Sequence, residues 1–273
     1  MTELWQPAHE AHAIAVMAIA MNFADQVPEK LLQRMLRIAG EHAPTLGLQS
    51  VLPVQTMNFN PASGMTPMVT GQLFTSIDPP PQLMGLELDF TKQVQVDQNL
   101  LLYRTSTYRS WKEELSDFLL FASPIIELMG GVIELAAVRV DYRDLFAYTG
   151  QDVAADVGKL LRKESDKLAP GVFRESRPWH SHFGQNLGEK GMPVRIAHTN
   201  LDFTEVEGVE GLGQALNIVT GRENRFPFRH LANSDYDANM VRDMLQTMHD
   251  ELIDLAKDIY TPDIQTRIGL SQK

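Results

Sequence analysis

The spacing of hydrophobic positions changes several times along this chain, and each spacing predicts a different kind of element. It is most regular between Asp235 and Tyr260, where apolar residues recur at alternating steps of four and three. Such steps keep one apolar stripe on one side of an α-helix. They predict a long C-terminal helix, capped at its start by Ser234 or Asp235. The stripe residues are Val241, Leu245, Met248, Leu252, Leu255 and Ile259.

Two earlier segments also carry helix signals. Pro28 suits the first turn of a helix, and the apolar face that follows it ends near Gly40, which can close the helix. Residues 110–113, Ser-Trp-Lys-Glu, fit a capping box, in which the serine oxygen and the glutamate each satisfy a free backbone amide. This second helix should reach the glycine pair at 130–131 and bend at Pro124, because proline lacks the amide that a helix interior needs.

Short apolar runs in the rest of the chain predict strands. They are residues 13–23, 69–77, 84–90, 100–108, 132–140 and 192–206, with a looser run over 48–59. Turn residues, among them the prolines at 79–81, separate the runs, and strands at this spacing favour an antiparallel meander. Residues 152–163 predict a short amphipathic helix, residues 169–191 show no consistent period, and residues 216–228 are ambiguous.

The order of these elements favours the α+β class. Runs of consecutive strands argue for antiparallel sheet covered by amphipathic helices, and against alternating strand–helix–strand units. We therefore expect residues 1–273 to form a single α+β domain. Residues 1–130 and 131–273 each follow the order strand, helix, strands, helix, so two pseudo-repeat halves are an alternative. No repeat at the level of single residues supports it.

Three segments bear a family resemblance. In the closing segment, residues 245–269, Met248-His249 in mid-helix leads to an exit at Ile259-Tyr260-Thr261-Pro262. The other two are Tyr108-Arg109-Ser110-Trp111 and Val138-Arg139-Val140-Asp141-Tyr142. Together they resemble a sporadically distributed family of uncharacterised prokaryotic proteins of similar length, whose last helix carries Leu-His and ends in Ile-Thr. The resemblance implies an α+β layout. No activity comes with the family, so it assigns no catalytic or cofactor-binding residue here.

Composition removes several classes of function. The formal net charge is −11 and no basic patch is visible, because the densest basic stretch, residues 159–167, alternates with acids. Proteins that bind nucleic acid usually show such a patch, so we expect no nucleic-acid partner. The chain has no cysteine. That excludes disulfides, iron–sulfur clusters and a cysteine nucleophile, and fits a cytoplasmic location.

The apolar run over residues 13–21 is the only segment that resembles a targeting sequence. It is too short to cross a bilayer. Glu3 and Glu10 precede it without any lysine or arginine, which is wrong for a signal peptide. We therefore expect no membrane partner and a buried strand or helix at this place.

Histidines supply the one candidate metal site. His180 and His182 would share a face of a strand, because side chains alternate along it, and so would His198 and Asp202 on the following strand-like run. Three imidazoles and a carboxylate can hold zinc or iron. The alternative is that these are surface or loop residues near a packed tryptophan, since nothing in the sequence brings the two segments together.

Other histidines carry weaker signals. His9-Glu10-Ala11-His12 superficially resembles a zinc-protease motif, but the step between its histidines is three where that motif needs four. His249 follows the helical stripe and should flank its buried face, where it could bond a strand carbonyl. The chain shows no nucleophile elbow, phosphate-binding loop or dinucleotide fingerprint.

These observations favour a non-enzymatic accessory protein that binds a protein partner or a second copy of itself. The helical stripe motivates this hypothesis, although packing of the stripe against the chain's own sheet explains it equally well. A metal-dependent enzyme that uses His180, His182, His198 and Asp202 is the first alternative. A small-ligand pocket between sheet and helices is the second.

Overall fold

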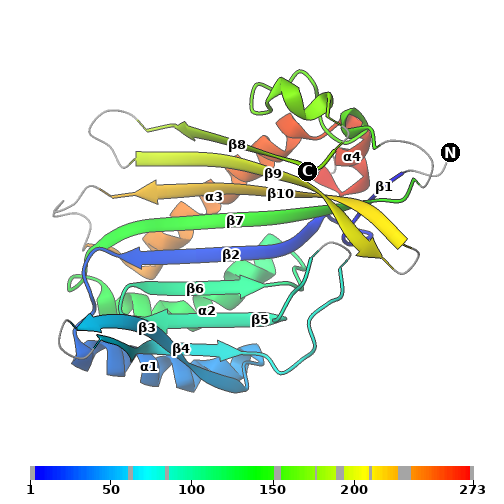
Figure 1. Cartoon of the computed structure of the whole chain (residues 1–273). Coiled ribbons are helices and arrows are strands. Elements are labelled where there is room, and N and C mark those ends of the chain that lie inside the picture. The colour runs from blue at the N-terminus through cyan, green and yellow to red at the C-terminus, as the bar shows by residue number, and fades with distance from the viewer. Residues whose placement is uncertain are drawn as a thin grey trace.

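The frame of the molecule is a ten-stranded sheet in which every pairing is antiparallel. The computed structural model describes residues 4–60, 64–83, 86–150, 155–175, 177–188, 194–208, 211–226 and 235–270. Along the sheet the strands follow the order β3-β4-β5-β6-β2-β7-β10-β9-β8, and β1 pairs with β7 beside this path (Figure 1). The central strands are therefore β2 and β7.

The strands are β1 (Trp5–Pro7), β2 (Ile14–Phe23), β3 (Ser50–Asn60), β4 (Gly64–Thr75), β5 (Lys92–Asp97), β6 (Leu100–Thr105), β7 (Leu135–Tyr148), β8 (Trp179–Asn186), β9 (Val194–Gly208) and β10 (Gly211–Arg225). The helices are α1 (Glu29–His42), α2 (Trp111–Met129), α3 (Ala238–Ile259) and α4 (Pro262–Arg267). Short 3₁₀ turns lie at Ala43–Leu46, Val157–Lys159 and Pro170–Phe173.

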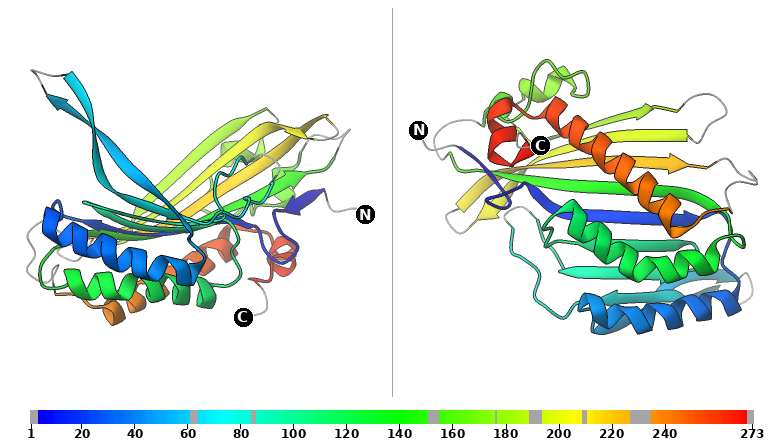
Figure 2. Two further views of the ribbon diagram at one scale, coloured as in Figure 1. Left: turned by 90° about the horizontal axis from the view of Figure 1, so that it is seen from below. Right: turned by 180° about the vertical axis from the view of Figure 1, so that it is seen from behind.

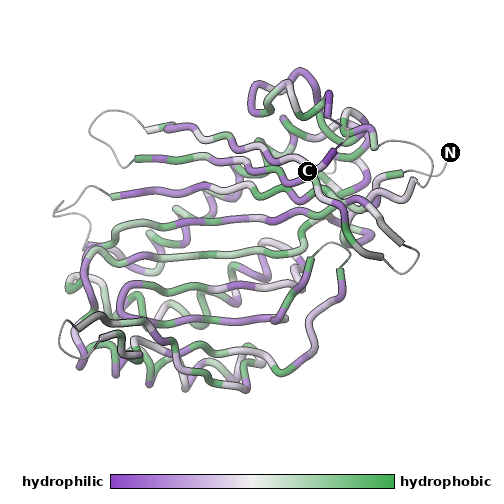
Figure 3. The backbone as a smooth tube through the Cα atoms, in the orientation of Figure 1, coloured by the Kyte–Doolittle hydropathy of each residue, from purple (hydrophilic) through white to green (hydrophobic). Residues whose placement is uncertain are grey.

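Three helices, α1, α2 and α3, cover one face of the sheet, and no described helix lies on the other (Figure 2). The sheet is bent, so that β3 and β4 at one edge and β8 to β10 at the other rise away from the helices (Figure 2). Hydrophobic and hydrophilic residues alternate along most strands (Figure 3). The main core fills the space between sheet and helices.

The stripe on α3 belongs to this core. Its six residues are between 0% and 6% exposed. The stripe therefore packs against the chain's own sheet and is not available to a partner. The cap is Asp237, whose carboxylate accepts from the amide of Met240, and not Asp235; Ser234 lies outside the described residues. The helix is 22 residues long and α4 follows it, so α3 does not end the described chain.

The structure confirms the α+β class, with antiparallel sheet covered by amphipathic helices. The strand expected over 13–23 is β2, and the helix expected after Ser110 is α2, with the Ser110 oxygen accepting from the amide of Glu113. Gly40, however, does not close α1, which continues to His42. Among the described helices none combines the length and the apolar character that crossing a bilayer requires.

Several expected elements were wrong. Residues 84–90 form no strand in their described part beyond the single bridge between Leu83 and Leu86. The next strand is β5, which begins at Lys92, and its sequence Lys-Gln-Val-Gln-Val-Asp places its buried valines among polar residues. In the described part of residues 152–163 the helix is only the turn Val157–Lys159. Within residues 169–191 the edge strand β8 escaped detection because it carries few apolar residues.

A second, smaller apolar cluster lies on the uncovered face. Ala15 of β2, Leu145 of β7 and Ala215 of β10 contact Leu86 there. Leu86 belongs to the connection between β4 and β5, which reaches these three strands. This contact holds the connection against the uncovered face.

Candidate functional site

The expected metal ligands share one face of the sheet, as the alternation of side chains predicts. On β8 and β9, His180 lies opposite Asp202 and His182 lies opposite Asn200, whereas His198 lies opposite Gly184. The Nδ1 atom of His182 is 2.9 Å from the side-chain oxygen of Asn200. Among the described residues no three His, Cys, Asp or Glu side chains gather closely enough to hold a metal ion. A metal site at these four residues therefore stays a prediction.

His198 of β9 instead approaches Asp141 of β7, across the intervening strand β10. A glycine, Gly221 of β10, stands between His198 of β9 and Asp141 of β7. A Cβ atom at Gly221 would lie 2.1 Å from His198 Cε1 and 2.3 Å from Asp141 Oδ1. Because the glycine has no side chain, His198 Nε2 comes within 3.5 Å of Asp141 Oδ1. Sequence patterns did not single out Gly221 or Asp141 as a pair.

Charged neighbours compensate this histidine–aspartate pair. Arg139 Nε lies 2.7 Å from the other oxygen of Asp141. Burial raises the pKa of Asp141 to about 6, although Arg139 opposes the shift. Burial, Arg139 and Arg222 lower the pKa of His198. Farther along, Asp202 stabilises the charge of Arg143, whose Nε donates to Asn217 at 3.2 Å. These charged and polar contacts between neighbouring strands lie on the uncovered face.

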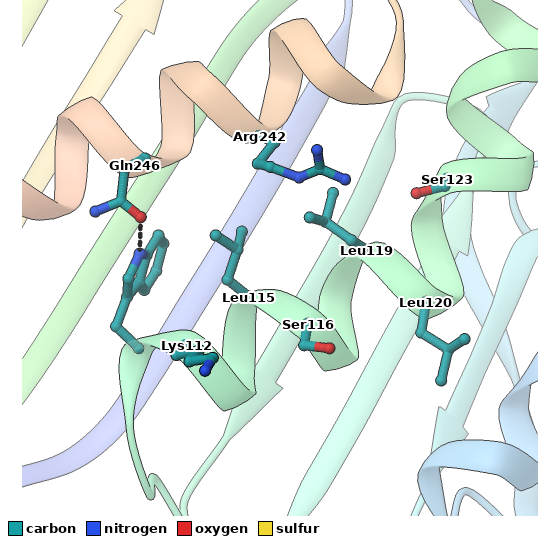
Figure 4. Close-up of a pocket in the computed structure, with 9 residues that line it drawn as sticks. Lys112, Leu115, Ser116, Leu119, Leu120, Ser123, Arg242 and Gln246 are labelled. Atoms are coloured by element: carbon teal, nitrogen blue, oxygen red, sulfur yellow. Dashed lines mark hydrogen bonds between the residues drawn. The ribbon is translucent and has the colours of Figure 1, made fainter.

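A groove of about 510 Å³ lies between α2 and α3 on the outer side of the helical layer. Leu115 and Leu119 of α2 and Arg242 and Gln246 of α3 project into it from the two sides (Figure 4). The dashed bond in that view joins the indole of Trp111 to the Gln246 oxygen, at 2.8 Å. The groove contains no acid–base pair among its lining residues, and it can only offer an apolar floor with cationic sides.

Three other described histidines, His9, His12 and His249, each contact neighbouring groups. His249 is 3% exposed, and its Nδ1 lies 2.9 Å from the hydroxyl of Tyr142 on β7, so one partner of its ring is a side chain of a central strand. Its ring also stacks on Trp111 with centroids 4.5 Å apart, and a bond from this ring to a strand carbonyl stays a prediction. His9 and His12 lie in the connection between β1 and β2, which is not helical, and their rings are 4.6 Å apart.

A small cavity of about 60 Å³ lies between the sheet and α3. Its polar lining comprises His12, Tyr108, Tyr142, Asp144, Thr220, His249 and Tyr260. Asp144, on the helix-covered face of β7, accepts a hydrogen bond from the hydroxyl of Tyr260. Its other oxygen is buried without a hydrogen-bond partner. Burial raises the pKa of Asp144 to about 6.

The most unusual surface is the hairpin of β3 and β4. Residues 42–77 contain no Asp, Glu, Lys or Arg. The described pairing of β4 with β5 covers only Gly71 to Thr75, so residues 64–70 of β4 pair with β3 alone. The hairpin therefore extends from the sheet as a two-stranded arm (Figure 2). We call residues 50–60 and 64–70 the arm.

One face of the arm is apolar and exposed to solvent. Met57 lies opposite Pro67, and Met65 and Val69 flank Pro67 on the same face of β4. Met57, Met65 and Val69 are 60%, 66% and 59% exposed. The outer edge of β3 is also the end of the sheet. Edge strands usually carry charges that prevent pairing with another chain, and this one has none.

Comparison with known proteins adds no family to this description: no family model matches the chain, and no curated protein is significantly similar to it. The family resemblance of Met248-His249 and its companion segments therefore stays a prediction.

Proposed function

We propose that this protein acts through association between protein chains, with the β3–β4 arm as the docking element and a second copy of the chain as its partner. The observation that carries the proposal is the exposed, uncharged face of the arm around Met57, Met65 and Val69. Contiguous exposed apolar surface marks interaction sites in soluble proteins. An isolated two-stranded hairpin is also only marginally stable in water, so a partner would stabilise this one.

Charge favours a second copy as the partner. Two chains that each carry a net charge of −11 repel each other over most of their surfaces. The arm is a surface on which they can meet without opposing carboxylates. A basic partner, by contrast, would select acidic residues at the contact. Two arms related by a twofold axis present the same face to each other, which is the usual geometry of a dimer.

Charge also argues against a lipid surface as the partner. Hairpins and helices that lie on membranes usually carry Lys or Arg beside their apolar face, because the lipid surface is anionic. The charged residues nearest to the arm in sequence are Glu41 and Asp78, which are both acidic. The arm therefore fits an uncharged protein surface better than a bilayer.

Sedimentation velocity over a concentration series tests the proposal. We expect the wild type to be a dimer and the double variant Met57→Glu, Met65→Glu to be a folded monomer. A carboxylate buried at the contact without a partner should raise the dissociation constant about a hundredfold or more. Circular dichroism should show an unchanged fold, because both side chains are exposed.

The matched control places the same charge elsewhere. Leu120 of α2 and Met240 of α3 are 52% and 47% exposed. The variant Leu120→Glu, Met240→Glu should remain a dimer. A monomeric wild type would refute the proposal, and so would an equal loss of dimer in both variants, since the contact would then not be specific to the arm. Dissociation of the control alone would move the interface to the helical layer.

A spectroscopic test uses the absence of cysteine. A single Gln55→Cys substitution on the exposed part of β3 gives a unique position for a spin label. Labels on two paired arms should give one short, narrow distance that disappears on dilution. A Lys112→Cys label on the exposed side of α2 should give a longer distance. A short distance from Lys112 and none from Gln55 would contradict arm-to-arm pairing.

We also propose that the sheet consists of two related halves, residues 1–130 and 131–273. The order of strand pairing supports this. In the first half β2 pairs with β6, the last strand before α2, and in the second β7 pairs with β10, the last strand before α3. A circular permutant opened between Gly130 and Gly131 should then fold with unchanged circular dichroism, and an unfolded permutant would count against a boundary there.

A further inference from the structure

The cavity beneath α3 lies on the opposite face of the sheet from the charge pairs described above. Besides its polar side chains it is lined by Ala13, Ile14, Leu252, Ile253, Ala256, Ile268 and Leu270. Leu252 and Ala13 are buried, whereas Ile253, Ala256 and Leu270 are only half-buried. These half-buried residues mark where the cavity approaches solvent. We therefore expect a small molecule to enter between α3 and residues 268–270.

Asp144 is the only acid among the described residues that line this cavity, and no described cation pairs with its charge. Its pKa is raised by burial and opposed only by the hydrogen bond from Tyr260, without any contribution from a positive group of the described chain. Asp141 on the same strand differs, because Arg139 and His198 lie 2.7 Å and 3.5 Å from its oxygens. A buried carboxylate without a counter-charge is unfavourable. A hydrogen-bond donor at the free oxygen of Asp144 would therefore be stabilising, and a positively charged donor would stabilise the carboxylate most.

Aromatic side chains surround this carboxylate. Tyr108, Tyr142 and Tyr260 line the cavity together with His12 and His249. All three tyrosine hydroxyls are occupied: that of Tyr260 by the carboxylate, that of Tyr142 by His249, and that of Tyr108 by Tyr142. Their rings remain as cavity walls, and aromatic faces attract cations that have left water. One carboxylate oxygen among aromatic walls suits an organic ammonium ion.

The volume of the cavity and the number of groups that could bind a metal ion narrow the class of ligand further. A volume of about 60 Å³ is well below the roughly 150 Å³ of a cavity that holds benzene. The ligand can therefore have only a few non-hydrogen atoms. Calcium and magnesium require about six or more oxygen ligands, and no group of three His, Cys, Asp or Glu in the described residues fits a metal.

We propose that this cavity binds a small primary amine in its ammonium form, with the free oxygen of Asp144 as the hydrogen-bond acceptor and the tyrosine rings as walls. This binding is independent of the arm, because no cavity residue belongs to β3 or β4. Ordered water that donates to the same oxygen is the competing occupant.

Isothermal titration calorimetry with methylammonium and ethylammonium tests the proposal. Methanol and ethanol are the controls of similar size without charge, and tetramethylammonium is the control that cannot donate a hydrogen bond. We expect saturable binding of one or both primary ammonium ions and none of the controls. Asp144→Asn should weaken binding about tenfold or more, because it removes a charge-assisted hydrogen bond. Tyr260→Phe, which keeps the carboxylate, should weaken it less.

The pH dependence of binding tests whether Asp144 is the group that binds the ammonium ion. Lowering the pH to 5 should weaken binding in the wild type, because Asp144, with a pKa of about 6, takes up a proton while the ligand stays charged. Burial keeps Tyr108, Tyr142 and Tyr260 protonated throughout, since it raises their pKa values. The pH effect should vanish in Asp144→Asn. If it persists there, it belongs to His12 or His249 and the assignment to Asp144 is wrong.

Two further results would overturn the proposal. One is the absence of binding by either primary ammonium ion, or equal binding of the alcohols. The other is a crystal grown with ethylammonium whose cavity contains ordered water alone. Neither result bears on the arm, because self-association is measured separately in sedimentation.

Discussion

The arm and the cavity depart from the usual distribution of residues in opposite directions. The arm exposes Met57, Met65 and Val69 to solvent, with no charged residue in residues 42–77 to accompany them. The cavity encloses the carboxylate of Asp144, which no cation in the described part of the chain pairs. Apolar side chains are usually inside and carboxylates outside, unless they are paired. Each region therefore lacks what a partner could provide: an apolar surface for the arm and a positive charge for the cavity.

The rest of the fold shows that this difference is local. The α3 stripe, the capped start of α2 and the alternating strands all follow the ordinary rules of packing. Proteins that satisfy those rules almost everywhere tend to break them at functional sites. The two exceptions are also far apart in the sequence of strands, because β3 and β4 end the sheet while Asp144 lies on central β7. We therefore treat them as separate sites.

The largest difference in stability is expected between two double variants, one with two carboxylates in the α3 stripe and one with two carboxylates in the arm. Leu245 and Leu252 are 0% and 2% exposed, so the double variant Leu245→Glu, Leu252→Glu should be unfolded at room temperature. Each buried carboxylate without a partner costs about 3–5 kcal/mol, and two exceed the stability of many domains. Circular dichroism and thermal melting should show this loss, whereas Met57→Glu, Met65→Glu should melt like the wild type. A folded stripe variant would contradict the packing of α3.

The sequence predicted the ordinary parts of the fold and missed the exceptions. Periodicity identified β2, α1, α2 and α3 because their apolar faces are continuous. It missed β5 and β8, whose positions in the sheet depend on pairing with distant strands. Pairing of distant residues is a tertiary effect that local patterns do not contain.

The candidate sites were visible in part. The missing charges of residues 42–77 could have been counted, although only the structure shows which side chains they leave exposed. Asp144 continues the row of Val138, Val140 and Tyr142, all of which are buried, so an acid on an apolar face was a detectable signal. The meeting of His198 and Asp141 across Gly221 could not be foreseen, because it depends on the register of three strands.

Removing the charge of Asp144 in the cavity should have a smaller effect on stability. The pKa of Asp144 is about 6 in the folded protein and about 3.9 in an unfolded chain. The stability that a raised pKa contributes is fully present below pH 4 and is lost as the pH rises through 6. Asp144→Asn, whose side-chain oxygen can still accept from Tyr260, should therefore be more stable than the wild type at pH 8, by up to about 3 kcal/mol.

Urea unfolding at pH 4, 6 and 8 checks this expectation. The difference between Asp144→Asn and the wild type should shrink toward pH 4, where the carboxyl group is neutral in both states. A variant that is less stable than the wild type at every pH would mean that the charge of Asp144 is already compensated in the free protein. The contrast between the cavity and the rest of the sheet would then disappear.

The smallest effect is expected for the paired acid on the other face of the same strand. Asp141 also has a raised pKa, but Arg139 and His198 contact it and its side chain is 17% exposed. Asp141→Asn removes both the unfavourable burial and the ion pair, so stability at pH 8 should change by only about 1 kcal/mol. A gain as large as that of Asp144→Asn would show that Arg139 does not compensate the charge.

Nuclear magnetic resonance of His198 gives an independent check. Its pKa should lie below 6.5 and rise in Arg139→Gln, because the guanidinium opposes the charged imidazole.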